Sequence, residues 1–346
     1  MRGVVFHGPR RLEVVDLPSA PLAPDEVRLH VERAGVCGSD VAAWRGDWPT
    51  PHIPSVKGHE VCATVTEIGA EVERLLPGTL VAVRPIRGCG SCKQCARGMY
   101  NRCQQFKMYG GDFPGGWAEE MVVRQDHARP LPPGITPDQG VLTEPIAVVT
   151  HAFGLAGSVR GAAVAIIGAG TLGLLAIQVA RLLGATSVYA TGRQDRKLEL
   201  ARRFGAQVGD TRSEDVIKAG LERGGPYDII LDMVGSSETL DQAIGLAAPG
   251  GMIAIVAGPH ESRLEFDYVA FRALEVSLIA SRIYGEDFNE AISLLGRGDL
   301  DLEPFITHRF DVGRAPEALE YVNANRAEAL KVVIQPGLDA LTEGSR

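Results

Sequence analysis

The sequence has no run of about twenty uncharged apolar residues, so we expect no membrane-spanning helix. Its N-terminal stretch contains no apolar signal-peptide core and alternates in the manner of a strand. A long basic tract is absent too: the longest cluster is Arg193–Lys197, and the chain carries a net charge of −8. Because nucleic-acid-binding surfaces concentrate positive charge, we expect neither a nucleic-acid nor a membrane partner.

The six cysteines come without an export signal, which favours a cytoplasmic metalloprotein over a secreted, disulfide-bonded protein. The sequence has no internal repeat and no low-complexity linker, and its 346 residues suffice for two domains with separate cores. Hydrophobic residues make up 45% and charged residues 23%, so the composition is that of an ordinary globular protein.

Two parts of the chain differ in pattern. Residues 1 to about 150 are rich in Gly and Pro and contain short alternating runs, which predict a compact, mostly β domain. From Gly161 onward, apolar strands alternate with amphipathic helices, which predicts an α/β domain with a doubly wound parallel sheet. We expect strands at 163–167, 187–191, 228–233 and 252–257, helices at 171–183 and 195–204, a later helix at 288–295, a closing strand at 329–334 and a loose tail at 337–346.

Four cysteines lie close together in the first part. Cys89, Cys92, Cys95 and Cys103 follow the spacing C-x2-C-x2-C-x7-C, which can bring four thiolates around one ion. Zinc in structural sites prefers such four-coordinate tetrahedral surroundings. Disulfides between cysteines this close would form small, strained rings. The spacing therefore predicts one structural zinc ion.

A G-x-G-x-x-G motif directly follows the strand expected at 163–167 and opens the next helix. Gly168 permits the tight turn, Gly170 lets the backbone approach a pyrophosphate, and Gly173 lets the helix lie close to the strand. Thr171 and Leu172 begin the helix, whose N-terminus stabilises phosphate charge. In this context the motif predicts a dinucleotide site, although a glycine loop without a ligand is the alternative.

The next strand lacks the acidic residue that would recognise the ribose 2′-hydroxyl of NAD. Gly192 stands near the expected position, and Arg193 follows it. A missing carboxylate removes repulsion toward a 2′-phosphate, and a guanidinium can bind that phosphate. We therefore favour NADP over NAD. The alternative is that Arg193 is a solvated loop charge or stacks on adenine while NAD binds.

Further candidate metal ligands are scattered along the first part. A catalytic zinc needs about three protein ligands and an open position. Cys37 and His59 are the expected ligands, while Glu60 and Glu144 compete for the third place and the other could hold the metal-bound water. We expect Asp40 to accept the free ring N–H of His59. Taken singly, the cysteine could be a core thiol and the histidine an ordinary loop residue.

At this point the chain resembles the zinc-containing medium-chain dehydrogenase/reductase family, and within it the polyol (sorbitol) dehydrogenase branch. The resemblance covers nearly the whole chain. It rests on residues 37–40 and 58–60, the four-cysteine lobe, Glu144-Pro145, the nucleotide loop and residues 307–310. Glu144 marks the branch, because the alcohol dehydrogenase branch usually carries a cysteine there.

The resemblance implies a GroES-like catalytic domain at 1–153, completed by 285–346, with a Rossmann domain at 154–284 between them. It also implies homodimers or homotetramers, and together with the motifs it predicts two zinc ions per chain, one catalytic and one structural. The expected reaction moves a hydride between NAD(P) and a secondary alcohol of a polyol, sugar or cyclitol, with or without an amino substituent. Zinc would stabilise the alkoxide and Ser39 would pass the proton outward, although Ser39 could instead cap a helix.

Several positions depart from the family pattern. A histidine common after Cys-Gly-Ser-Asp is replaced in 41–44, and the expected Arg-Tyr pair reads Ile283-Tyr284, so no specific polyol is carried over. The loop aromatics could line a pocket or pack a lobe; they are Trp44, Trp48, Phe113 and Trp117. The runner-up activity is that of an amino-alcohol dehydrogenase of the L-threonine type. A zinc-ribbon nucleic-acid binder would explain the cysteine lobe alone, and a catalytically silent zinc-binding relative is the other non-enzyme alternative.

Overall fold

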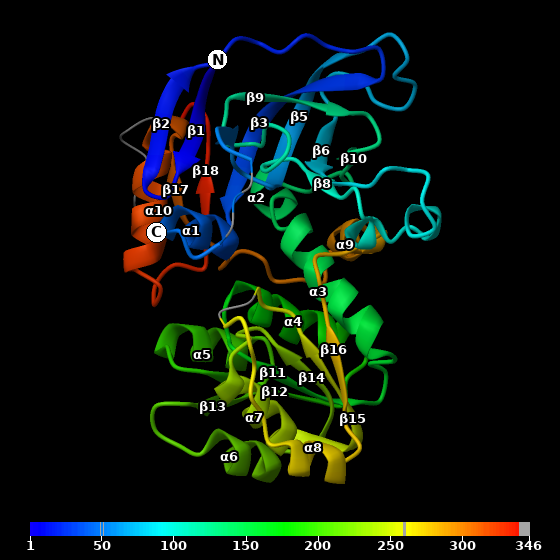
Figure 1. Ribbon diagram of the computed structural model, residues 1–346, viewed down its shortest axis with the longest axis vertical. Helices are drawn as coiled ribbons and strands as arrows, with labels where there is room; N and C mark the ends of the chain where they lie inside the picture. The colour runs from blue at the N-terminus through cyan, green and yellow to red at the C-terminus, as the bar shows by residue number, and fades with distance from the viewer. Residues whose placement is uncertain (49, 51, 259–260, 339–346) are drawn as a thin grey trace. The chain divides into compact units, whose positions relative to one another are not determined.

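The structure is a computed structural model that describes residues 1–48, 50, 52–258 and 261–338 (Figure 1). The chain divides into two compact units. Unit 1 comprises Met1–Glu144, Ala291–Gly298 and Leu302–Arg346, and unit 2 comprises Pro145–Glu290 and Asp299–Asp301. The boundary predicted after residue 153 falls inside helix α3 (Thr143–Ala156), whereas this division falls in the first turn of the same helix.

A sheet with the strand order β10-β6-β5-β3-β18-β17 forms the centre of unit 1, and β9 also pairs with β3. Alternate residues of β3 are buried, including Val27, Leu29 and Val31, because one face of the sheet covers the core. Strand β18 lies between β3 and β17, so the closing strand expected from the sequence is an interior strand. The strands are β3 (Glu26–Val36), β5 (Glu60–Ile68), β6 (Leu80–Val83), β9 (Glu120–Arg124), β10 (Ala128–Pro130), β17 (Ile306–Phe310) and β18 (Lys331–Ile334).

Smaller elements complete unit 1. One sheet has the order β2-β1-β4, and β7 pairs with β8. These strands are β1 (Arg2–Gly8), β2 (Arg11–Asp16), β4 (Ser55–Val56), β7 (Ile86–Arg87) and β8 (Lys107–Met108). The helices are α1 (Gly38–Arg45), α2 (Pro137–Gly140) and α10 (Ala315–Ala324), with 3-10 turns at η1 (Cys95–Arg97), η2 (Tyr100–Arg102) and η3 (Val312–Arg314). Helix α9 (Asp287–Arg297) crosses the division between the units.

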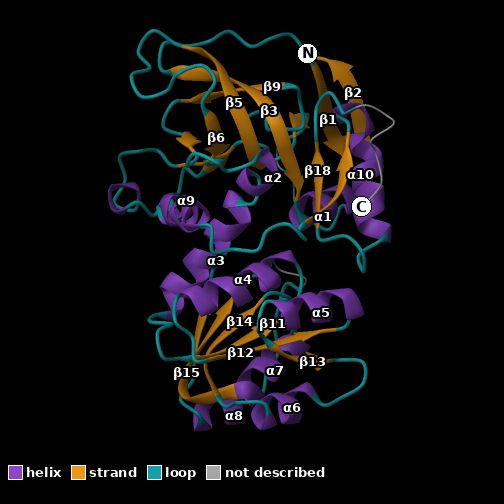
Figure 2. Cartoon of the chain, turned by 180° about the vertical axis from the view of Figure 1, so that it is seen from behind, coloured by secondary structure: helices purple, strands orange, loops and turns teal. Residues whose placement is uncertain are grey.

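Unit 2 contains a six-stranded parallel sheet with the order β13-β12-β11-β14-β15-β16. This is the order of a dinucleotide-binding Rossmann sheet, which confirms the predicted fold class. Figure 2 shows α4 and α5 on one face and α6, α7 and α8 on the other. The strands are β11 (Ala163–Ile167), β12 (Ser187–Gly192), β13 (Gln207–Asp210), β14 (Tyr227–Asp232), β15 (Ala247–Ile255) and β16 (Ser277–Ala280). The helices are α4 (Thr171–Leu182), α5 (Asp195–Arg203), α6 (Val216–Glu222), α7 (Ser237–Leu246) and α8 (Tyr268–Ala273).

Most predicted elements of unit 2 agree with the structure to within two residues. Strand β15 differs, because it begins at Ala247 and accommodates Gly250 and Gly251 through a shift in its register with β14. Residues 339–346 of the expected tail lie outside the described residues. Within the described ranges, no helix is long and apolar enough to cross a membrane.

Candidate metal and nucleotide sites

Two neighbouring strands bring the first group of predicted ligands together. Strand β3 ends one residue before Cys37, which caps the N-terminus of α1, and the adjacent β5 begins at Glu60, directly after His59. The register of the two strands places Gly35 opposite Glu60. As a result, the ligand atoms of Cys37, His59 and Glu60 all lie within 4.8 Å of one another.

This group suits a bound cation. His59 is buried, and burial by itself disfavours its protonated form. The negative charge of Asp40, the Cys37 side chain and Glu144 nevertheless raise the pKa of His59 well above its usual value. The surroundings therefore stabilise positive charge at this place. A thiol, an imidazole and carboxylates are also the donors that zinc binds, so the residues present fit this metal.

Asp40 does not accept the ring N–H of His59 as the sequence predicts, and supports the ligand group in another way. Its Oδ1 lies 3.8 Å from His59 Nδ1, which is too long for a hydrogen bond, so the predicted hydrogen bond is not formed and the two groups interact as charges. The other oxygen, Asp40 Oδ2, accepts a hydrogen bond from the backbone N–H of Cys37 at 3.0 Å. Asp40 thus fixes the turn that presents the cysteine.

Glu60 is held by a lysine that no motif in the sequence marks. Lys331 Nζ on β18 donates to both carboxylate oxygens of Glu60, at 2.6 Å each, and both side chains are buried. Gly35 makes room for this pair, because a Cβ there would lie 1.9 Å from Glu60 Oε2. The only sign of this pair in the sequence is that Lys331 begins the otherwise apolar strand at 331–334, and the sequence analysis did not use it.

The remaining residues predicted for this site are Glu144 and Ser39. Glu144 is buried in the first turn of α3, and its charge contributes to raising the pKa of both His59 and Lys331, but it does not belong to the group of ligand atoms within 4.8 Å. Ser39 is half-buried in the first turn of α1, where Cys37 and not Ser39 is the cap.

The four lobe cysteines also converge. All four sulfur atoms lie within 4.8 Å of one another, with Cys89 Sγ 4.0 Å from Cys95 Sγ and Cys92 Sγ 3.9 Å from Cys103 Sγ. Tetrahedral zinc with bonds of about 2.3 Å requires sulfur atoms about 3.8 Å apart, so the geometry fits this ion. Hydrogen bonds from Ser91 lower the pKa of Cys89 to about 6, whereas burial raises that of Cys95 to about 12.

Replacing Cys95 by serine should reduce the zinc content by about one ion per chain and destabilise the protein by about 2 kcal/mol, because metal binding contributes to folding. Metal analysis and thermal unfolding measure both effects. Lys93→Ser is the matched control, since Lys93 is an exposed residue of the same lobe and is not a predicted ligand. Equal zinc content in the two variants would contradict the structural zinc site.

In unit 2 the glycine loop has the geometry of a phosphate-binding turn. The N–H groups of Gly168 and Ala169 donate to Thr191 O on β12, which ties the loop to the neighbouring strand. Gly170 caps α4, and Thr171 and Leu172 begin it. Gly173 must lack a side chain, because a Cβ there would lie 2.0 Å from Gly168 O. The loop therefore presents the N-terminus of α4 without obstruction by a side chain at this position.

A cationic cluster follows β12, where no carboxylate stands. Arg193 is exposed, and Lys197 lies in the first turn of α5. Burial, together with the charges of Arg196 and Arg193, lowers the pKa of Lys197 to about 8. Both arginines thus lie close enough to repel the charge of Lys197, which places this member of the basic cluster seen in the sequence beside Arg193.

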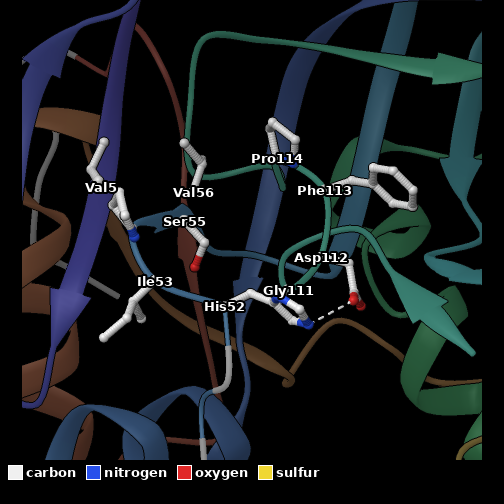
Figure 3. A pocket seen from close by; sticks show the side chains of 10 residues that line it. Val5, His52, Ile53, Ser55, Val56, Gly111, Asp112, Phe113 and Pro114 are labelled. Carbon is white, nitrogen blue, oxygen red and sulfur yellow. Dashed lines mark ion pairs between the residues drawn. The ribbon is translucent and has the colours of Figure 1, made fainter.

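The loop aromatics take different positions. Trp44 and Trp117 are buried in the core of unit 1, while Trp48 and Phe113 pack partly buried against it. Phe113 lines a cavity of about 520 Å³, together with residues that include Val5, Ile53 and Val56 (Figure 3). None of the predicted metal ligands lines this cavity.

Comparison with known proteins agrees with both units. The alcohol dehydrogenase GroES-like domain matches residues 23–133, and the zinc-binding dehydrogenase domain matches residues 171–297. The chain is 33% identical to L-threonine 3-dehydrogenase of Pyrococcus abyssi, over 91% of this chain and 92% of that protein. It is also 33% identical to galactitol 1-phosphate 5-dehydrogenase of Escherichia coli K12, over 90% of this chain and 93% of that protein.

Solved structures give the same result. A Sinorhizobium meliloti 1021 protein bound to NADP has a TM-score of 0.90 and 31% identity, covering 97% of this chain and 99% of that one. An E. coli CFT073 dehydrogenase complexed with NADH has the same TM-score and coverage at 27% identity. The chain therefore belongs to the zinc-containing medium-chain dehydrogenase/reductase family and is a zinc-dependent, NAD(P)-dependent alcohol dehydrogenase that acts on CH–OH groups.

Proposed function

We propose that this enzyme moves a hydride between NADP and a secondary alcohol of a polyol, sugar or cyclitol, with or without an amino substituent. The observation that carries the proposal is the half-buried Cys37 together with three buried side chains, His59, Glu60 and Glu144. Carboxylates beside the reacting alcohol can accept hydrogen bonds from neighbouring hydroxyl groups, which favours a polyhydroxylated substrate over a simple alkyl alcohol.

In the proposed site Cys37 and His59 hold the catalytic zinc, which supplies Lewis-acid stabilisation of an alkoxide when bound. Lys331 neutralises Glu60, which favours Glu144 as the third ligand and Glu60 as the group that holds the water or substrate hydroxyl.

Asp40 fixes the backbone N–H of Cys37, and Ser39 accepts the substrate proton and passes it outward. The four lobe cysteines hold the second zinc ion. A homodimer or homotetramer and the domain boundaries after residues 153 and 284 remain predictions.

A second activity is supported by one observation. The 33% identity to L-threonine 3-dehydrogenase of Pyrococcus abyssi favours an amino-alcohol substrate as the alternative. Both reactions oxidise a secondary alcohol, so the fold alone does not separate them.

Initial rates of cofactor reduction by the zinc-loaded enzyme test the proposal. The panel contains hexitols, hexitol 1-phosphates, cyclitols, aminocyclitols and L-threonine, each with NAD and with NADP. Turnover with a polyhydroxylated alcohol supports the proposal, whereas turnover with L-threonine alone replaces it by the alternative. The same reactions in reverse, with the corresponding ketones, keep the test valid for an enzyme that works as a reductase.

The cofactor preference should depend on pH. Lys197 is a cation below its pKa of about 8 and neutral above it, so raising the pH from 7 to 9 removes a charge that attracts the 2′-phosphate. NADPH binding should weaken by up to about tenfold over this range, a loss of about 1.4 kcal/mol. NADH binding should change less, because NADH has no 2′-phosphate. Fluorescence titration with both cofactors measures the difference.

Arg193→Ala serves as the companion variant. It should weaken NADPH binding by about tenfold and leave NADH binding nearly unchanged, because it removes a guanidinium that the 2′-phosphate would bind. Glu199→Gln, an exposed site on α5, the helix that follows Arg193, is the control. Tighter binding of NADH than of NADPH by the unaltered protein would contradict the preference for NADP.

A further inference from the structure

One segment of unit 1 carries positive charge and contains no acidic residue. Residues 74–111 contain seven Lys and Arg side chains and no Asp or Glu, although the whole chain has a net charge of −8. A zinc ion with four thiolates would carry a net charge of about −2 and would balance only part of this charge. The segment therefore holds more cations than its own proposed metal site requires.

Two of these cations are opposed across a short ladder. In the antiparallel pair of β7 and β8, Arg87 lies directly opposite Lys107. Like charges in opposed positions destabilise strand pairing, by up to about 1 kcal/mol. An anion bound by both side chains would convert this repulsion into attraction.

A single aromatic ring orients both cations. Arg87 Cζ lies 5.2 Å from the centroid of the Phe113 ring, and Lys107 Nζ lies 5.8 Å from it. Cation–π contacts at these distances are favourable and restrict where the two long side chains can point. Figure 3 shows the Phe113 ring turned away from the side of the cavity that Val5 forms. The two cations thus contact the same ring.

No described residue supplies a carboxylate that forms an ion pair with either cation. Asp112, the acidic residue nearest to Lys107 in the sequence, is already engaged. Its Oδ1 pairs with His52 Nε2 at 3.0 Å, and its Oδ2 accepts the backbone N–H of Met108 at 2.9 Å (Figure 3). Arg87 and Lys107 are therefore left without a protein counter-ion among the described residues.

The chain connects this pair to the loop that supports one of the predicted catalytic ligands. Strand β8 leads into a loop whose backbone packs on Gly58, with Gly116 N–H donating to Gly58 O at 2.9 Å. Gly58 directly precedes His59. A group bound by Arg87 and Lys107 would lie at the start of the loop that supports this predicted ligand.

We propose that Arg87 and Lys107 form a phosphate subsite, which binds either the phosphate monoester of a phosphorylated polyol or a free phosphate ion. The guanidinium can donate two parallel hydrogen bonds to the phosphate oxygens, and the ammonium adds a third. The assignment to a phosphorylated substrate rests on the proposed function, whereas binding of the anion itself does not.

Titration of the full-length, zinc-loaded protein with inorganic phosphate, followed by ³¹P NMR, tests the subsite. The protein carries Arg193→Ala, so that the cationic cluster of unit 2 contributes less to the signal. We expect saturable binding that weakens at least tenfold in R87Q/K107Q. The matched control is K93Q/R97Q, which removes the same charge from exposed positions of the same acid-free segment. It should change binding less than twofold.

Three results would overturn the subsite. They are the absence of saturable binding, equal weakening in both double variants, and loss of a zinc ion in R87Q/K107Q, which would identify the pair as counter-charges of the cysteine lobe.

Kinetics distinguish the two sources of phosphate. If the substrate carries it, kcat/KM should be higher for a hexitol 1-phosphate than for the hexitol, and R87Q/K107Q should remove this preference. If the ratio is unchanged in that variant while phosphate binding is lost, the subsite binds free phosphate. Absence of turnover with every alcohol and ketone would contradict the proposed function and leave the titration result standing. Equal loss of the preference in K93Q/R97Q would overturn the assignment to the substrate.

Discussion

Replacing Cys37 by serine should lower kcat/KM by about a thousandfold or more and reduce the zinc content from two ions per chain to one. The thiolate is the softest donor of the group that includes His59 and Glu60, and a serine hydroxyl is a poor ligand for zinc. Loss of the metal removes the Lewis acid on which alkoxide formation depends. Metal analysis and initial rates of the purified variant measure both effects.

Cys62→Ala is the matched control for this experiment. Cys62 is buried on β5, and burial raises the pKa of its thiol, so it is a structural thiol and not a predicted ligand. This variant should keep both zinc ions and most of the activity. Near-normal activity and two zinc ions in Cys37→Ser would show that the catalytic metal is held elsewhere.

Replacing Lys331 by methionine should destabilise the protein by about 3–5 kcal/mol, because it leaves the carboxylate of Glu60 buried without its counter-charge. Denaturation by guanidinium chloride measures the change in the free energy of unfolding. The double variant E60Q/K331M should recover more than half of the loss, since it removes the buried charge together with its partner.

A second buried lysine provides the control. Lys57 is also buried, and no described carboxylate forms an ion pair with it, so burial lowers its pKa. Lys57→Met should therefore change stability by less than about 1 kcal/mol. If both lysine variants were equally destabilised, or if E60Q/K331M were no more stable than Lys331→Met, the charge pair would not be the cause.

The elements that could be predicted from the sequence depend on short-range patterns. The strands and helices of unit 2 follow from alternating apolar runs, and right-handed connections then leave few topologies for the parallel sheet. The cysteine lobe was predictable for the same reason, because Cys89 and Cys103 and the two cysteines between them are close in the chain. The predicted fold class and family are confirmed.

The parts that escaped prediction depend on contacts between distant segments. Lys331 reaches Glu60 across 271 positions, and nothing near either residue in the sequence indicates the pairing. The expectation of a hydrogen bond between Asp40 and His59 is wrong: the two side chains are 3.8 Å apart, and Asp40 accepts a hydrogen bond from the nearby Cys37 N–H. Side-chain competition of this kind is decided by geometry that residue types alone do not specify.

The place of β18 in the sheet has a consequence for how this chain is made. Unit 2 is nearly continuous in sequence, so its parallel sheet can close during translation. Unit 1 cannot, because β18 fills the gap between β3 and β17 and carries Lys331. Until the ribosome has released that strand, the nascent unit 1 exposes an unpaired strand edge, and the carboxylate of Glu60 lacks its counter-charge. Chaperones therefore have more time to bind unit 1 than unit 2 during synthesis.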